Sequence, residues 1–251
     1  MTPVVERHHR LDALRGLALV WMTAYHFSFD LNHFGFIRQN FNDDPLWTLQ
    51  RTAIVSLFLF TAGVGQALAV QAGQGWARFG RRWGQIAGCA ALVSLGSWWM
   101  FPRSWISFGV LHGMAVMLLL ARAGLAGRWL RGWAPWVLGA ALLAAAPLLG
   151  LWLAAHADTP LAAALDSRWL NGLGVVTHKP VTEDYVPLLP WLGVLLLGVG
   201  AGQWVPRAVL ARPVGRLGRG LALLGRWSLS YYMLHQLVLM GALTAWTVWR
   251  P

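Results

Sequence analysis

Charged side chains and cysteine are both scarce in this sequence. Asp, Glu, Lys and Arg make up only 12% of the 251 residues, whereas hydrophobic residues make up 57%. A typical soluble domain has a charged fraction of roughly 25%. The composition therefore argues against an ordinary soluble domain and predicts an integral membrane protein. The single cysteine, Cys89, excludes an intrachain disulfide.

Several stretches lack charged residues for long enough, or nearly long enough, to supply the roughly 20 residues that cross a bilayer. We predict an all-α integral membrane protein, a polytopic bundle of about seven transmembrane helices that forms one domain over residues 1–251. No cleavable signal peptide is expected, because no small-residue cleavage pattern follows the first apolar run. The expected spans are residues 13–31, 52–75, 83–101, 104–121, 133–156, 185–206 and 227–249.

The few charges are distributed unevenly between the expected connections. Most of the arginines fall in every second connection, and most of the acids fall in the others. Because cytoplasmic loops accumulate Lys and Arg, this pattern predicts a cytoplasmic N-terminus and a C-terminus outside. The net charge of +11 is then explained by topology together with contact with anionic lipid or a phosphorylated ligand, and nucleic-acid binding is a poor explanation.

A histidine and a carboxylate stand four residues apart in the first expected span, at His26 and Asp30. Helical spacing places them in one narrow sector with Arg15, Met22 and His33. Ionisable side chains are costly inside a bilayer, so this pair is a candidate catalytic site. Asp30 could accept a hydrogen bond from His26 and raise its basicity, as a general base requires. The alternative is a buried pair that only ties helices together.

Two further histidines lie within expected spans. His112 stands between Gly109 and Gly113 at an expected depth comparable with that of His26, where it could donate to an oxyanion or form an interhelical hydrogen bond. His235 and the neighbouring Tyr232 are expected nearer the cytoplasmic half, as candidate cofactor contacts. For both histidines a purely structural role stays open.

Six sequence blocks in a fixed order resemble the bacterial branch of the heparan-alpha-glucosaminide N-acetyltransferase family, within the wider transmembrane acyltransferase group. The resemblance covers nearly the whole chain. His26 matches the family's histidine in the first helix, and Asp30 matches the acid that follows it. The blocks are Arg10–Ala18 (RLDALRGLA), Tyr25–Leu31 (YHFSFDL), Ser56–Val64 (SLFLFTAGV), Phe108–His112 (FGVLH), Pro187–Gly193 (PLLPWLG) and Leu224–Tyr231 (LGRWSLSY).

The resemblance implies transfer of an acyl group, usually acetyl from cytosolic acetyl-CoA, to a sugar hydroxyl or amine on the far side of a bacterial inner membrane. Acetyl-CoA is thus the expected co-substrate, and an extracytoplasmic glycan or amino sugar is the expected acceptor. The nucleotide phosphates are expected among Arg15, Arg81 and Arg82, because arginine suits bidentate phosphate recognition. His26 then acts as base or as nucleophile. Membrane lipids and a second copy of the chain are further expected partners, and no metal site is expected.

Two other functions remain open from the residues alone. Intramembrane imidazoles could ligate a haem b for electron transfer, and His26 with His112 is the pair expected at matching depth. A transporter for a small polar or anionic solute is also possible, although no inverted repeat is visible in the sequence.

Overall fold

The computed structural model describes residues 8–182 and 184–249, and these residues form helices and no strand. Long helices occur at all seven predicted places: α1 (His9–His33), α2 (Pro45–Gln71), α3 (Trp76–Met100), α4 (Val110–Ala126), α5 (Ala134–Ala154), α7 (Leu188–Trp204) and α10 (Ser228–Trp249). The shorter elements are α6 (Pro160–Asp166), a 3₁₀ turn (Asn171–Leu173), α8 (Arg207–Ala211) and α9 (Arg216–Arg226). The all-helical class is therefore confirmed for the described residues.

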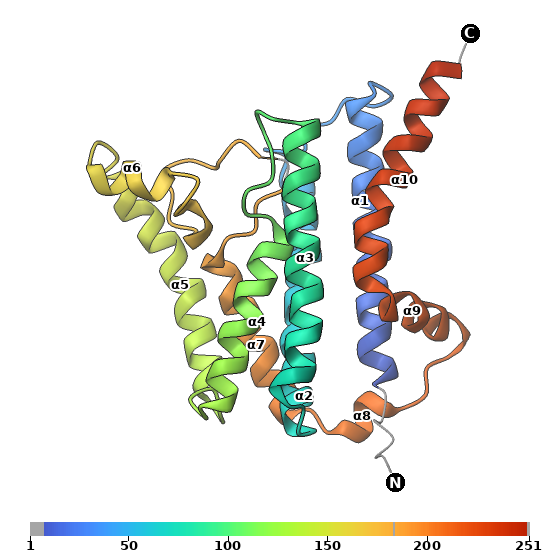
Figure 1. Ribbon diagram of the computed structural model, residues 1–251, viewed down its shortest axis with the longest axis vertical. Helices are drawn as coiled ribbons and strands as arrows, with labels where there is room; N and C mark the ends of the chain where they lie inside the picture. The colour runs from blue at the N-terminus through green and yellow to red at the C-terminus, as the bar shows by residue number, and fades with distance from the viewer. Residues whose placement is uncertain (1–7, 183, 250–251) are drawn as a thin grey trace. The chain divides into compact units, whose positions relative to one another are not determined.

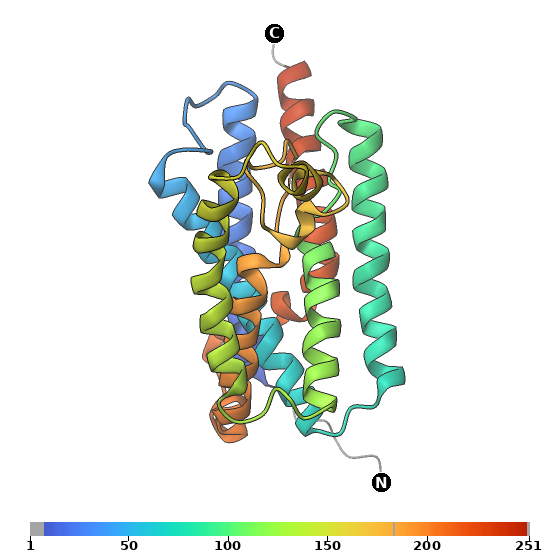
Figure 2. The same ribbon diagram turned by 90° about the vertical axis from the view of Figure 1, so that its left-hand side faces the viewer.

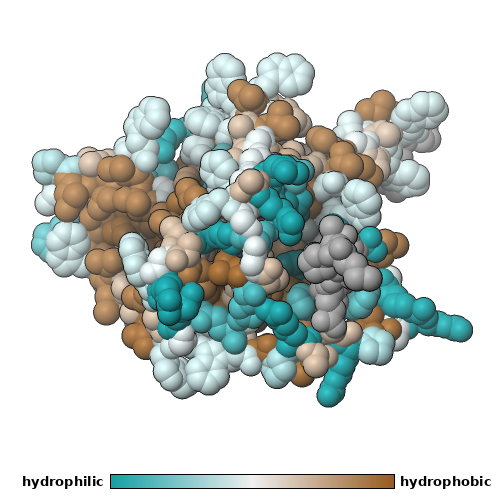
Figure 3. All heavy atoms as spheres, turned by 60° about the horizontal axis from the view of Figure 1, so that its bottom comes forward, coloured by the Kyte–Doolittle hydropathy of each residue, from teal (hydrophilic) through white to brown (hydrophobic). Residues whose placement is uncertain are grey.

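Two of these helices, α2 and α5, are long and apolar enough to cross a bilayer, while α4 and α7 are apolar but shorter. The apolar surface of α5 is little used in packing, since only 11% of its most apolar window is buried. Its Val137, Leu148 and Leu151 side chains are largely exposed, and hydrophobic side chains reach the surface over wide areas in Figure 3. Large exposed apolar patches of this kind indicate contact with lipid or another apolar partner. The full set of seven spans and the orientation of the termini stay predictions.

The chain packs as two compact units. The first consists of Met1–Thr61 with Val205–Pro251, and the second is Ala62–Trp204. Helix α2 begins in the first unit and ends in the second.

In the first unit, α1 packs against α9 near its amino-terminal end and against α10 further along (Figure 1). Glycines make the α1–α9 contact close. A Cβ atom on Gly16 would collide with the carbonyl of Leu221, and one on Gly225 would collide with the carbonyl of Asp12. Backbone therefore lies directly on backbone at this crossing, as is common for helices that associate through small residues.

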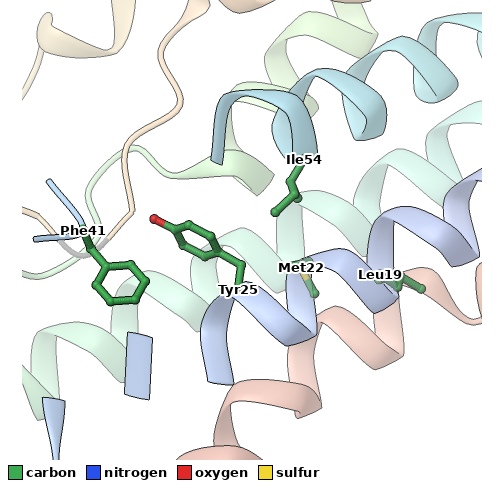
Figure 4. Close-up of a cluster of buried hydrophobic side chains, with 5 residues drawn as sticks. All are labelled: Leu19, Met22, Tyr25, Phe41 and Ile54. Atoms are coloured by element: carbon green, nitrogen blue, oxygen red, sulfur yellow. The ribbon is translucent and has the colours of Figure 1, made fainter. Parts of the chain in front are cut away.

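A cluster of buried hydrophobic side chains fixes another side of α1 (Figure 4). Its members are Leu19, Met22, Tyr25, Phe41 and Ile54. The Tyr25 ring meets the Phe41 ring edge-on at a centroid distance of 5.7 Å. These residues hold α1 against the start of α2 and against the connection before it. The packing therefore fixes the rotation of α1 about its own axis, and with it the direction in which the polar residues of α1 face.

In the second unit, α5 and α7 run antiparallel in close contact (Figure 2). Gly139 lies opposite Gly193, and Gly200 lies against the Trp136 ring. Helix α4 begins later than the predicted span from residue 104, because the Asp184 carboxylate accepts the Val110 N–H at 2.7 Å and thereby caps the helix there.

Candidate functional site

Polar side chains of α1 and α10 pair at three successive levels within the first unit. The two helices run in the same direction, since residues later in α1 pair with residues later in α10. The pairs are Thr23 with Tyr231, whose hydroxyl oxygens are 2.7 Å apart, His26 with His235, whose ring centroids are 5.1 Å apart, and Asp30 with Gln236. Of the stripe predicted on the first helix, His26 and Asp30 therefore face the last helix.

Asp30 is paired differently from the prediction. The Gln236 Nε2–H donates to Asp30 Oδ1 at 2.7 Å, and Asp30 forms no hydrogen bond with His26 among the described residues. The predicted Asp30–His26 hydrogen bond is thus wrong for this structure, in which Asp30 Oδ1 is paired with the Gln236 amide of the neighbouring helix. Asp30 is 1% exposed. A carboxylate this deeply buried with a single neutral donor is energetically costly and calls for an explanation.

Three buried atoms of this cluster lack a hydrogen-bond partner: Asp30 Oδ2, Gln236 Oε1 and His235 Nε2. All three are acceptors. The His235 Nδ1–H donates to the Tyr232 carbonyl at 2.7 Å, so Nε2 of the neutral ring carries no hydrogen. The α1–α10 site therefore presents three unpartnered buried acceptors, and it is suited to a ligand that brings its own N–H or O–H groups.

His235 lies at the level of His26, so the predicted difference in depth between these two histidines is wrong. The rings of Tyr231 and His235 are stacked at 6.0 Å, which holds the His235 ring beside α1. Tyr232 contributes its carbonyl to His235 and packs its ring against the hydrophobic cluster around Tyr25. The predicted cofactor role of His235 and Tyr232 stays untested.

His26 itself has ring contacts with Tyr25 at 5.8 Å and with His235 at 5.1 Å. Neither of its ring nitrogens has a hydrogen-bond partner within residues 8–182 and 184–249. Both nitrogens are thus available for proton transfer. With His235 Nε2 also unpartnered, the site holds two imidazoles side by side that can each accept a proton.

His112 belongs to the second unit, and both of its ring nitrogens are already engaged there. Nδ1 accepts the Gly109 N–H at 3.2 Å, so the neutral ring carries its hydrogen on Nε2, which lies 3.0 Å from Ser94 Oγ. Ser94 in turn donates to the Ile106 carbonyl at 2.7 Å. These contacts tie the start of α4 to α3 and favour the structural role over an oxyanion contact.

We expect His112→Ala to lower stability with little effect on catalysis. The substitution leaves the Gly109 N–H and Ser94 Oγ without their partner, which costs roughly 1–3 kcal/mol when such groups are buried. Thermal unfolding of the purified variant checks this expectation, and Ser94→Ala serves as the matched control on the same network. A normal melting temperature combined with lost turnover would instead restore a catalytic role for His112.

The three arginines predicted to hold phosphate are divided between the two units, with Arg15 in the first and Arg81 and Arg82 in the second. Arg15 Nη1 donates to Asp12 at 3.1 Å and Nη2 donates to the Thr61 carbonyl at 3.3 Å. Arg81 and Arg82 are exposed in the second unit, where Arg82 donates to Gln85 Oε1 at 3.0 Å. Their contact with a nucleotide stays a prediction.

The described residues thus define an all-helical protein with a buried polar site between its first and last helices. Residues 7–237 match the family model described as heparan-alpha-glucosaminide N-acetyltransferase, catalytic. The chain belongs to this family of acetyltransferases. No curated protein and no solved structure matches the chain.

The family match confirms the resemblance seen in the sequence, while the bacterial branch stays a prediction. It does not favour a transporter or a haem carrier. Within residues 8–182 and 184–249, no three His, Cys, Asp or Glu side chains lie close enough together to hold a metal ion.

Proposed function

We propose that this protein is a membrane-embedded acetyltransferase that moves the acetyl group of cytosolic acetyl-CoA onto the primary amine of a sugar on the extracytoplasmic side. Membership of the acetyltransferase family supports the reaction class. The choice of an amine over a hydroxyl rests on the α1–α10 site.

The set of unpartnered buried acceptors carries this proposal. Asp30 Oδ2, Gln236 Oε1 and His235 Nε2 lack donors, and a protonated primary amine brings three N–H donors together with a positive charge. A sugar hydroxyl brings one donor and no charge, so it would leave buried acceptors unsatisfied and the carboxylate uncompensated. An ammonium group is thus the better match for the site.

Conversion of an ammonium group into an amide releases two protons, and the two histidines offer a place for each. His235 Nε2 accepts the first proton and frees the nitrogen lone pair. The amine then attacks the thioester carbonyl carbon, and His26 accepts the second proton as the C–N bond forms. The C–S bond breaks, the proton held by His26 neutralises the departing thiolate, and His235 loses its proton to water before the next turnover, so that each cycle releases one proton. Arg81 and Arg82 are exposed and are the proposed contacts for the phosphates of acetyl-CoA.

Purified protein in lipid nanodiscs tests the proposal through its choice of acceptor. With acetyl-CoA present, we expect thiol release and an N-acetylated product from glucosamine, and neither from N-acetylglucosamine, which offers only hydroxyls. Mass spectrometry of the product identifies the modified atom. Equal acetylation of both sugars would contradict the proposal that the acceptor group is an amine. Folded protein that releases no CoA with amine or hydroxyl sugars would contradict the acetyltransferase proposal itself.

A further inference from the structure

Helix α9 has one side packed against α1 and a second side that is exposed and mixed in character. Ala222 and Gly225 are buried. Leu217 is 81% exposed and Leu223 is 56% exposed. Both leucines of this 11-residue helix are therefore accessible to an apolar partner.

The exposed side of α9 around Leu223 carries positive charge, whereas Leu217 lies on the opposite side of the helix from Arg219 and Arg226. Arg216, Arg219 and Arg226 are exposed, and none of them forms an ion pair within the parts of the chain that the structure describes. The sequence contains no Asp or Glu after Asp184. An anionic partner that approaches α9 therefore meets no competing carboxylate in this part of the chain.

We propose that α9 lies in the membrane interface and binds the headgroups of anionic phospholipids. Exposed leucines and arginines on one helix are typical of an interfacial amphipathic helix, in which the apolar side chains enter the acyl boundary and the basic ones reach the phosphates. Trp227, which directly follows α9, is also exposed, and tryptophan prefers this depth in a bilayer. The partner is thus an anionic lipid surface, which satisfies the leucines and the arginines together.

The chemistry of α9 distinguishes a lipid from a soluble nucleotide. Both offer phosphate, but only a lipid also covers Leu217 and Leu223. The arginines are spread over three turns of a surface helix, as suits several headgroups. Because α9 contacts α1 through Gly16 and Gly225, its attachment to lipid also anchors the helix that carries His26.

Lipid retention by the full-length protein tests the proposal. We expect native mass spectrometry of protein extracted from mixed phosphatidylcholine and phosphatidylglycerol bilayers to show severalfold enrichment of phosphatidylglycerol. The variant Arg216→Gln, Arg219→Gln, Arg226→Gln should lose most of this enrichment. A matched triple variant in other connections, Arg38→Gln, Arg103→Gln, Arg168→Gln, should keep it.

Two further measurements keep the test decisive. A variant with lysine in place of the three α9 arginines should retain the enrichment, because headgroup attraction depends on charge and not on guanidinium geometry. High salt should weaken retention in the wild type. Unchanged enrichment in the glutamine variant would overturn the proposal, and so would displacement of phosphatidylglycerol by coenzyme A, which would assign α9 to the nucleotide. None of these readouts depends on acetyl transfer.

Discussion

His26→Ala is expected to reduce acetyl transfer to an amino sugar by about 100-fold or more, the range typical for loss of a general base. In the proposed mechanism His235 takes up the first proton of the amine. The variant then has no second group to accept the proton that is released as the C–N bond forms. The fold should survive. His26 accepts and donates no hydrogen bond among the described residues, so its removal leaves no buried partner unsatisfied.

Initial rates of CoA thiol release at saturating acetyl-CoA measure the effect, and circular dichroism with thermal unfolding checks the fold. His33→Ala is the matched control, since His33 lies on the same helix but is exposed at its end. The control should retain wild-type turnover. If purified His26→Ala turned over like the control, the assignment of His26 as the base would be wrong.

The positions of the long helices could be predicted because they depend on local sequence. An uncharged apolar run of sufficient length favours a helix wherever it occurs, and all seven predicted places contain one. His26 and Asp30 were recognisable for a similar reason, because two ionisable residues one turn apart in such a run are conspicuous.

The partners of His26 and Asp30 were beyond sequence reasoning because they lie about 200 residues away along the chain. The level of His235 could not be predicted because it depends on where α10 begins along α1. In the structure α9 occupies the amino-terminal end of α1, so α10 begins further along α1 and Tyr231 reaches Thr23. The amide that binds Asp30 comes from Gln236, a residue that no motif singles out.

Helix α9 was also missed, although a signal was present. Leu217, Leu221 and Leu224 follow helical spacing, but glycines interrupt the segment and prolines precede it. One of them, Gly225, is needed for the close approach to α1, which leaves no room for a Cβ atom at this position. Tertiary packing therefore outweighed the low helix propensity of glycine.

Asp30→Asn is expected to lower kcat/KM for an amine acceptor by roughly 10- to 100-fold. A hydrogen bond between charged groups contributes about 1.5–3 kcal/mol, and each 1.36 kcal/mol is a factor of ten in rate. Asparagine has the same shape and keeps an oxygen for the Gln236 Nε2–H, so the α1–α10 contact persists while the negative charge is lost. On the proposed mechanism, that charge holds the ammonium group of the acceptor.

The kinetic pattern separates this role from a structural one. The loss should be concentrated in KM for the amino sugar, with KM for acetyl-CoA and the melting temperature close to wild type. Asp12→Asn is the matched control, because Asp12 is on the same helix but pairs with Arg15 outside the polar site. The Asp12→Asn variant should leave KM for the amino sugar unchanged. An Asp30→Asn variant with unchanged kcat/KM for glucosamine would show that the carboxylate does not bind the acceptor, whereas equal losses for both substrates with a lowered melting temperature would show that Asp30 mainly supports the fold.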